Sequence, residues 1–155
     1  MRHTKFLILA VLVVVPLTIG ANSVNADNDG GKRKLTVMEH ADSDTVADVG
    51  AAGDSLGDVL AFGNPIFDTS NTKQVGRDQG YCIRTNVGES WECNWTVLLD
   101  NGSLTVEGPF YDDLHDSQLA ITGGTGAYRN AGGEMTLHAR NAAGTEFDFI
   151  YRVSP

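Results

Sequence analysis

The stretch GPFYDDLHDSQLAITGGTGAYRNAGGEMTLH, residues 108–138, gives the clearest indication of how this chain folds. It places a Gly-Pro strand end, a short apolar strand, a glycine-rich corner and a further strand in unbroken order. The corner, Gly123 to Gly126, is not a phosphate-binding loop, because no Gly-Lys-Ser/Thr follows it and it opens no helix after a parallel strand. A tight corner that needs positive φ explains these glycines better. The stretch therefore predicts strands joined by a tight corner in a small β-barrel.

Strand-like runs recur at short intervals along the rest of the chain. They lie near residues 35–40, 56–67, 73–85, 91–99, 103–110, 117–122, 132–140 and 145–153. Turn-forming residues separate them, and no segment has the periodicity of a long amphipathic helix. This number of short strands favours a closed all-β barrel or a sandwich, and an eight-stranded barrel is about the size that holds side chains or one small ligand. We expect a single domain over residues 35–155.

The N-terminus has the three parts of a secretory signal peptide. A basic start precedes an apolar run at residues 6–19, and residues 24–26, Val-Asn-Ala, offer a small-x-small cleavage site. The alternative, a permanent membrane anchor, needs roughly 20 apolar residues, more than this run contains. We therefore expect residues 1–26 to be removed, residues 27–34 to form a flexible leader, and the protein to be secreted. No later run is long and apolar enough to span a membrane, so we expect no membrane partner after signal removal.

The chain of 155 residues carries a formal net charge of −9. All 20 acidic residues lie beyond the predicted signal peptide, whereas two of the 11 basic residues lie within it. Such an acidic surface repels phosphate backbones, so we expect neither nucleic acid nor anionic membranes as partners. The simplest role of the charge is to keep a secreted protein soluble.

The two cysteines, Cys82 and Cys93, lie on neighbouring strand-like runs, GYCIRT and WECNWTVLL. A two-residue turn between Asn86 and Glu89 would place the cysteines directly opposite each other. Because export exposes the chain to an oxidising environment, we predict a cross-strand disulfide worth roughly 3 kcal/mol in the loop-entropy model. The spacing excludes a CxxC site, and two cysteines alone make a poor zinc site.

Motifs of metal and nucleophile chemistry are missing from the sequence. The chain has no GxSxG elbow and no HExxH pair, and His40, His115 and His138 are scattered without ligand spacing. The acidic loop at residues 42–54 lacks the central glycine and final glutamate of a calcium-binding EF-hand. We therefore expect no metal and no cofactor.

Residues 53–153 resemble the superfamily of eight-stranded barrels that includes the allene oxide cyclases and the dirigent proteins. The matching segments are GDSLGDVLAFGNPIFD, VGRDQGYCIRT, GSLTVEGPFYDDLHDSQLAITGGTGAYRNAGGEMTLH and FDFIYRV, in the family's order. The resemblance implies an eight-stranded antiparallel β-barrel with an apolar interior cavity, and often a homotrimer packed on outer barrel faces. This superfamily contains enzymes, stereochemical guides without an oxidative centre of their own, and cyclases of polyketide rings, so the fold alone does not select an activity.

The resemblance also marks individual residues. The cyclases carry a glutamate on the first strand at the end of the cavity, and it matches Glu39 here. The asparagine that follows in the cyclases falls on Ala41, and no proline lies between Ala41 and Gly57, so the pair that holds a water against the epoxide oxygen is missing. Cys82 matches a cavity-facing cysteine of the cyclases, although here Cys93 offers it a disulfide partner.

Two functions from different classes follow. The first is a secreted isomerase or cyclase that folds a small apolar molecule inside the barrel without a cofactor. Glu39 would orient a polar group of that molecule or act as a general base. Arg84 would bind an anionic or carbonyl group, or else form an outer salt bridge. Trp95 and Tyr111 would line the cavity, or else simply pack the core.

The second function is a non-catalytic carrier of an apolar ligand, or a dirigent-like guide that acts with a separate oxidase. A third alternative is a filled barrel with a structural role. The interior discriminates among them. An open pocket that ends in a buried Glu39 with polar neighbours favours catalysis, a wholly apolar pocket favours carriage, and a filled interior excludes both.

Overall fold

The computed structural model describes residues 26–29 and 32–154. The predicted signal peptide, except for its last residue, lies outside these residues. The elements are β1 (Ala26–Asp29), β2 (Lys32–His40), β3 (Thr45–Ala47), β4 (Val59–Phe62), β5 (Pro65–Phe67), β6 (Gln74–Asn86), β7 (Ser90–Leu99), β8 (Gly102–Tyr111), β9 (Ser117–Gly124), the 3-10 helix η1 (Gly126–Tyr128), β10 (Gly132–Ala139) and β11 (Glu146–Ser154). Within the described residues, no helix has the length and apolar character needed to cross a membrane.

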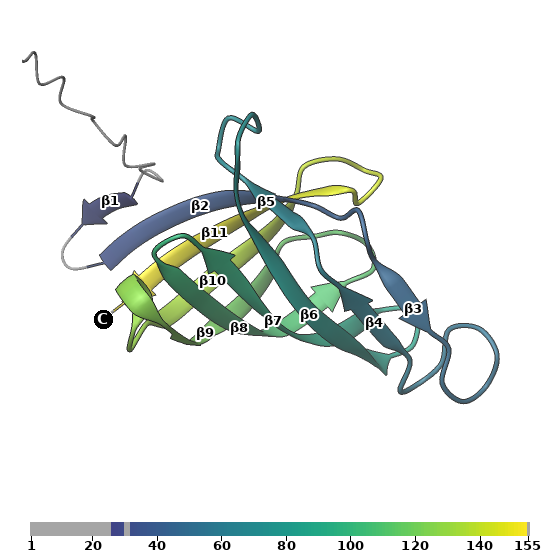
Figure 1. The fold of residues 1–155 in the computed structure, drawn as a ribbon. Helices are drawn as coiled ribbons and strands as arrows, with labels where there is room; N and C mark the ends of the chain where they lie inside the picture. The colour runs from purple at the N-terminus through teal and green to yellow at the C-terminus, as the bar shows by residue number, and fades with distance from the viewer. Residues whose placement is uncertain (1–25, 30–31, 155) are drawn as a thin grey trace, which may run out of the picture.

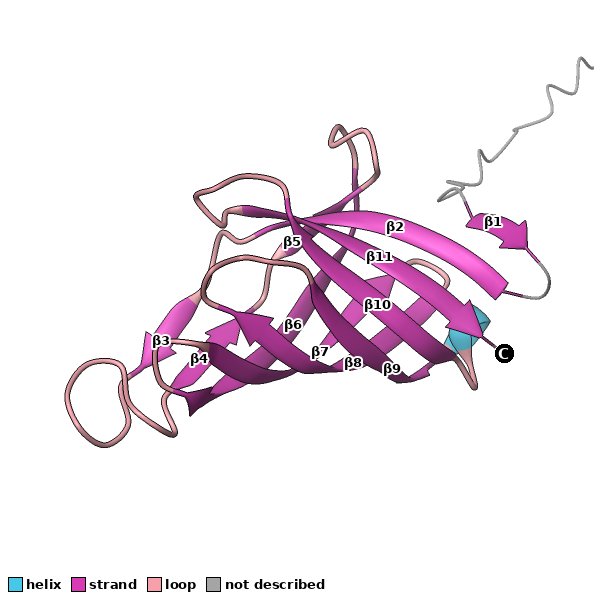
Figure 2. Cartoon of the chain, turned by 180° about the vertical axis from the view of Figure 1, so that it is seen from behind, coloured by secondary structure: helices cyan, strands magenta, loops and turns pink. Residues whose placement is uncertain are grey.

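The strands form one antiparallel sheet that closes on itself. β2 pairs with β11, and antiparallel neighbours then follow in the order β11, β10, β9, β8, β7 and β6. Strand β5 pairs with β2 on one side and with β6 on the other, which completes a ring of eight strands, β2 and β5 to β11. Figures 1 and 2 show this ring from opposite sides. The all-β, eight-stranded antiparallel barrel predicted from the sequence is confirmed.

The run predicted as one strand at residues 56–67 is two strands, β4 and β5, separated by Gly63 and Asn64. β4 pairs with β3 and β6, whereas β5 pairs with β2 and β6. At the break the backbone N–H of Asp78 on β6 donates to the Asn64 carbonyl at 2.9 Å. The chain therefore changes its neighbour at Asn64, and this change is what closes the barrel.

The core lies inside the ring and follows the alternation of side chains along each strand. The buried, inward-facing residues of β7 and β11 are Trp91, Cys93, Trp95, Val97, Phe147, Phe149, Tyr151 and Val153. Burying a large apolar side chain of this kind contributes roughly 1.5–3 kcal/mol. The aromatic stripes of these two strands thus form a large part of the barrel interior.

The glycine-rich corner allows backbones to approach closely. Gly126 has a φ of 58°, in the left-handed region that favours glycine. A Cβ on Gly124 would lie 2.5 Å from the Tyr128 carbonyl oxygen and 2.6 Å from that of Ser103. The need for positive φ predicted from the sequence thus holds at Gly126, whereas Gly124 is required by contact with neighbouring backbone.

The disulfide predicted between Cys82 and Cys93 is present, and the two residues are directly paired across β6 and β7. The turn differs from the prediction, because Asn86 pairs with Ser90 and not with Glu89. A register shift between residues 84 and 86 takes up the additional residue. The bulge therefore leaves the pairing at the cysteines as the sequence predicted it.

Two segments that the sequence treats as irregular contain short strands. β2 begins at Lys32, inside the range 27–34 expected to be a leader, and residues 26–29 pair with it as β1. The acidic loop at residues 42–54 contains β3, which pairs with β4. Each of these short strands lies at an edge of the sheet, so pairing satisfies the backbone groups on one of its sides.

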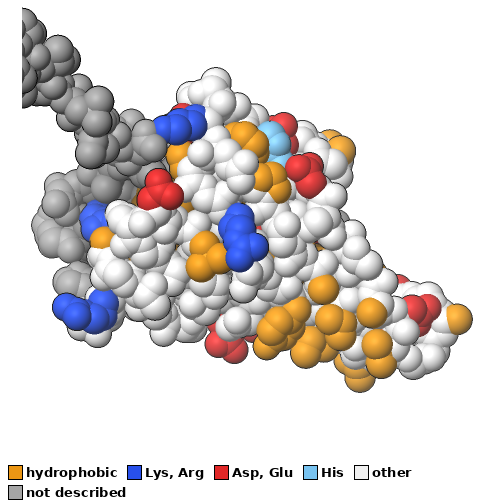
Figure 3. Space-filling model, in the orientation of Figure 1, with side chains coloured by type: hydrophobic (Ala, Val, Ile, Leu, Met, Phe, Trp, Pro, Cys, Tyr) orange, Lys and Arg blue, Asp and Glu red, His pale blue; other side chains and the backbone are white. Residues whose placement is uncertain are grey.

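Hydrophobic side chains gather on an outer face over β3, β4 and β6 (Figure 3). Val46 on β3 and Tyr81 and Ile83 on β6 are among its exposed members. Tyr81 and Ile83 point outward because they alternate with the inward-facing Cys82. The homo-oligomer implied by the family resemblance would use outer faces of this kind, and it stays a prediction.

Gly80 tests the packing of β6 against β7. A Cβ there would lie 2.2 Å from the Cβ of Trp95 and 2.6 Å from the Asn94 carbonyl oxygen. We expect Gly80→Ala to lower the free energy of unfolding, measured with urea, by about 2 kcal/mol, in the range that overpacking typically costs. Gly123→Ala is the control, because a Cβ there meets nothing within 4 Å. Equal losses in the two variants would contradict this account.

Candidate functional site

A pocket of about 160 Å³ opens into the barrel interior. Its lining residues are Glu39, Asp44, Leu60, Phe62, Cys82, Cys93, Trp95, Phe110, Leu137, Gly144, Phe147 and Phe149. Most of this wall is apolar and aromatic, and Glu39 and Asp44 contribute its carboxyl groups. The interior is therefore neither filled nor wholly apolar.

Glu39 reaches the pocket from β2. It lies on the same face of the strand as Leu35 and Val37, which are buried in the core, so its side chain points inward as well. Only 6% of Glu39 is exposed. The side-chain amide of Asn64 donates to its Oε1 at 2.8 Å. The residue singled out by the family resemblance thus lies buried at the pocket wall with a polar neighbour.

Asp78 lies behind Glu39 and forms a carboxyl pair with it. It is fully buried on β6, and the backbone N–H of Asn64 donates to its Oδ1 at 2.9 Å. Burial raises the pKa of Asp78 to about 6. Burial, and after it the charge of Asp78, raises the pKa of Glu39 well above its usual value, so the two carboxyl groups are close enough to interact. Burial therefore favours the protonated form of both carboxyl groups, and the titration of each depends on the charge of the other.

Asn64 organises the polar end of the pocket. Its Nδ2 donates to Glu39 and, at 2.8 Å, to Asp44. Its Oδ1 accepts from the backbone N–H and the hydroxyl of Ser43, each at 2.9 Å. Every polar atom of the buried amide group therefore has a partner, which fixes Glu39, Asp44 and Asp78 relative to one another.

Tyr151 and Trp95 place two further polar atoms in this region. Tyr151 is fully buried, and its pKa is raised first by burial and then by the charges of Asp78 and Glu39. The indole N–H of Trp95 lies near the Tyr151 hydroxyl and acts on its pKa in the opposite direction. Neither atom has a partner of good hydrogen-bond geometry, and the same is true of Asp78 Oδ2. Buried polar atoms of this kind are suited to a water or a ligand atom.

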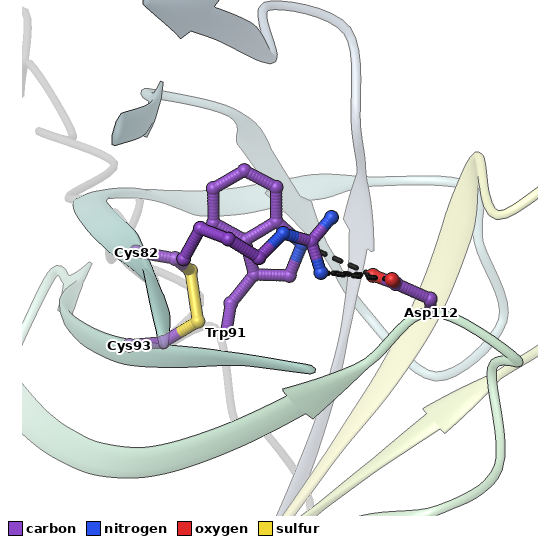
Figure 4. The surroundings of a disulfide bond; sticks show 5 residues. Cys82, Trp91, Cys93 and Asp112 are labelled. Carbon is purple, nitrogen blue, oxygen red and sulfur yellow. Dashed lines mark hydrogen bonds and ion pairs between the residues drawn. A yellow bond between two sulfur atoms is a disulfide. The ribbon is translucent and has the colours of Figure 1, made fainter. Parts of the chain in front are cut away.

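Arg84 does not line the pocket. Its guanidinium lies 3.9 Å from the centre of the Trp91 ring, and Nη1 donates to both carboxylate oxygens of Asp112 at 2.9 and 2.8 Å. Its Nε lies 2.6 Å from the Asp54 carboxylate. Figure 4 shows Trp91 and Asp112 near the Cys82–Cys93 disulfide, with the contacts to Asp112 drawn as dashed lines. Arg84 thus forms salt bridges, as the alternative interpretation expected. It is nevertheless buried, with 6% of its surface exposed, and it lies on the same inward face of β6 as Cys82.

Trp95 lines the pocket, whereas Tyr111 does not. Tyr111 follows the pocket residue Phe110 on β8, so strand alternation turns its side chain to the outer face. There its ring stacks on His115 with the centroids 3.9 Å apart. Of the side chains proposed from the sequence to contact a ligand, the structure thus brings Glu39 and Trp95 to one pocket.

Sequence reasoning missed Asp78, Asn64 and Tyr151. The sequence did indicate Asp78, because it lies four residues before Cys82 on the same strand and therefore faces the same side of the sheet. Tyr151 likewise continues the stripe of Phe147. Asn64 had no such signal, since it lies between two strands and its role depends on contacts distant in sequence. Among the described residues, no group of three or more His, Cys, Asp or Glu side chains is arranged to hold a metal ion.

Residues 27–154 match the family model described as "Dirigent-like protein". Because this match covers most of the chain, the protein belongs to the dirigent-like family. The family resemblance seen in the sequence is confirmed.

Solved structures share the barrel. Pyocyanin demethylase is 30% identical over 76% of this chain and 99% of its own, with a TM-score of 0.65. The pterocarpan synthase dirigent protein GePTS1 is 18% identical over 89% of this chain and 96% of its own, with a TM-score of 0.63. The Diels-Alderase AbmU from Streptomyces koyangensis is 13% identical over 81% of this chain and 71% of its own, with a TM-score of 0.60. At identities this low, the last two likenesses show the fold alone.

The carboxyl pair gives folding stability a pH dependence of unusual sign. A carboxyl group whose pKa is raised on folding stabilises the fold below its unfolded pKa, and this contribution is lost as the pH rises through its folded pKa. For Asp78 the loss runs from pH 3.8 to about 6, and for Glu39 it begins near the ordinary pKa of 4.5 and continues as the pH rises. We expect Glu39→Gln to become more stable than the native protein as the pH rises above about 4.5, with the difference growing through pH 6. Guanidinium unfolding at each pH measures this difference.

Two facts make the comparison specific. The lowered pKa of Asp58 acts in the opposite sense, but below the ordinary value of 3.8 and so outside this range. Glu92→Gln removes the same charge from the exposed face of β7, and it should follow the native curve. A difference that does not change with pH would contradict the raised pKa of Glu39.

Proposed function

We propose that this protein is a cofactor-independent enzyme that binds a small apolar molecule inside the barrel and moves a proton on it, as an isomerase or cyclase does. The observation that carries the proposal is the Glu39–Asp78 pair at the end of an aromatic pocket. A carrier needs no ionisable pair there, and burying carboxyl groups costs on the order of several kcal/mol. Strongly shifted pKa values in a cleft are typical of functional sites.

The pair can take and return one proton by itself. Glu39 lines the pocket, and Asp78 lies behind it. When Glu39 passes its proton to Asp78, its carboxylate becomes free to accept a proton from the bound molecule, and the pair becomes neutral. The neutral pair then returns a proton to a different atom of that molecule. Such a cycle isomerises the molecule with no net change in protons.

Trp95 and Tyr151 would support the charge that develops during this transfer. The Trp95 side chain lines the pocket, and the Tyr151 hydroxyl lies behind it. Preorganised donors in a buried site are among the strongest contributions to catalysis. Epoxide opening of the allene oxide cyclase kind is less well supported. Asn64 is the asparagine beside Glu39, and its amide N–H groups donate to Glu39 and Asp44, so they are not free to hold a water against an epoxide oxygen.

The comparisons support a small-molecule role and suggest a probe. The family match and the fold shared with a dirigent protein and a Diels-Alderase are consistent with a ligand held inside the barrel. The relative named pyocyanin demethylase makes pyocyanin a suitable first test molecule. The disulfide suits an oxidising environment, and we keep secretion and a homotrimer as predictions.

A dirigent-like guide is the second candidate, and the family match favours it. A guide holds a molecule in one conformation while the reaction is driven from elsewhere. It has no need to exchange hydrogen with its ligand. Hydrogen exchange with solvent therefore separates the two candidates.

The test begins with native mass spectrometry and extraction of any molecule that co-purifies with the protein. That molecule and pyocyanin are then incubated with the protein in D₂O, and their masses are followed. We expect conversion, or deuterium uptake at carbon, and we expect Glu39→Gln and Asp78→Asn each to slow it by about 10²–10⁴-fold, the usual contribution of an acid–base group. Glu92→Gln should keep the native rate.

The outcomes that oppose the proposal are distinct. Binding without conversion or deuterium uptake would contradict an enzyme and support a carrier or guide. An undiminished rate in Glu39→Gln would show that the reaction does not use the pair.

The rate should also depend on pH in a defined direction. The pair acts as a base only when it holds one proton and not two. Because the pKa of Asp78 is about 6, we expect kcat/KM to rise with pH through about this value. A rate that stays constant between about pH 5 and 8 would contradict this assignment.

A further inference from the structure

We propose that the pocket selects its ligand by charge: it takes an uncharged or cationic aromatic molecule and rejects one that carries a carboxylate or a phosphate. This inference rests on the proposed small-molecule site. It concerns binding only, so it does not require the bound molecule to react.

Aromatic rings make up much of the pocket wall. Phe110 meets Phe147 edge-on with the centroids 5.9 Å apart. Trp95 meets Phe62 and Phe149 with centroid distances of 6.1 and 5.6 Å. All five residues line the pocket, so ring faces and edges are available to a further ring.

The size of the pocket suits a small ring system. An enclosed apolar cavity of roughly 150 Å³ holds one benzene molecule. The present pocket, at about 160 Å³, is only partly enclosed, so it leaves room for a ligand to project beyond its mouth. We therefore expect the pocket to bind a molecule with about one aromatic ring or two fused rings.

Every charged side chain in the wall is a carboxyl group. Glu39 lies at the buried end, Asp44 is exposed and so lies towards solvent, and Asp78 stands behind Glu39. Among the described residues, no lysine or arginine lines this pocket. Arg84 has the right strand parity, but it is already paired with Asp112.

This distribution leaves an anionic ligand without a partner. A carboxylate within about 5 Å of Asp44 or of the Glu39–Asp78 pair is repelled, and in a partly enclosed site the repulsion weakens binding by at least about tenfold. A cation in the same place is attracted. A neutral hydroxyl avoids the repulsion and can still bond with Glu39 or Trp95.

Three naphthalene probes with the same ring and different charge test the inference. 2-Naphthol is neutral at pH 7, 2-naphthoate is an anion, and 2-naphthylmethylammonium is a cation. Isothermal titration calorimetry with the purified protein measures the three affinities. We expect the naphthoate to bind at least about tenfold more weakly than naphthol, and the ammonium probe at least as tightly as naphthol.

Asp44→Asn tests the source of the selectivity. We expect it to narrow the ratio between the affinities of the cationic and anionic probes by about threefold or more. Asp100→Asn is the matched control, because Asp100 is exposed in the turn between β7 and β8 and does not line the pocket. The Asp100→Asn variant should bind the cationic and anionic probes with the same affinity ratio as the native protein.

Any of three results would overturn the inference: naphthoate binding as tightly as naphthol, no binding of any probe, or an unchanged ratio in Asp44→Asn. Failure of the proposed enzyme has a different outcome. In that case the charge ranking holds, while deuterium uptake by the extracted ligand and by pyocyanin is absent. Turnover that depends on Glu39 together with tight naphthoate binding would refute the charge selection alone.

Discussion

The hydrogen bonds of Asn64 hold together the closure of the barrel and the buried acid inside it. The Asn64 backbone pairs with Asp78 on β6, and its side-chain amide donates to Glu39 on β2. These are the two strands that β5 joins to close the ring. A polar junction of this kind inside an apolar core is stable only when its groups are satisfied, and the amide group of Asn64 uses all of its polar atoms. The geometry of the site is therefore a consequence of how the barrel closes.

The carboxyl pair shows how the interior tolerates acid. Burying two ionised carboxylates side by side is costly, so burial and mutual repulsion raise the pKa of both groups and favour their protonated forms. The arrangement still raises the pKa of Asp78 to about 6, so the pair weakens the fold at neutral pH. Stability given up in this way is common at sites where a group must change its protonation state.

The hairpin of β6 and β7 carries both a part of the acidic pocket wall and a buried cation, Arg84. Cys82 and Cys93 line the pocket, and Arg84 pairs in register with Trp91 two residues further along the same faces of β6 and β7. There Arg84 is bound by Asp112. The cation is thus neutralised beside the pocket and not within it, which leaves the pocket wall negative.

Alternation along strands is a local property, and the features that depend on it were predictable from the sequence: most of the strands, the pairing of the two cysteines, the aromatic core and the family. The sequence also carried an unused indication of Asp78, which shares the face of Cys82. Which side chains meet depends on the tertiary structure. Asn64 reaches Glu39 across 25 residues, and Arg84 reaches Asp112 across 28. A local pattern tells which face a residue takes, but closure of the ring determines which distant residue stands opposite. The stretch 108–138 therefore predicted the barrel, while the chemistry inside it depended on a junction that no local pattern marks.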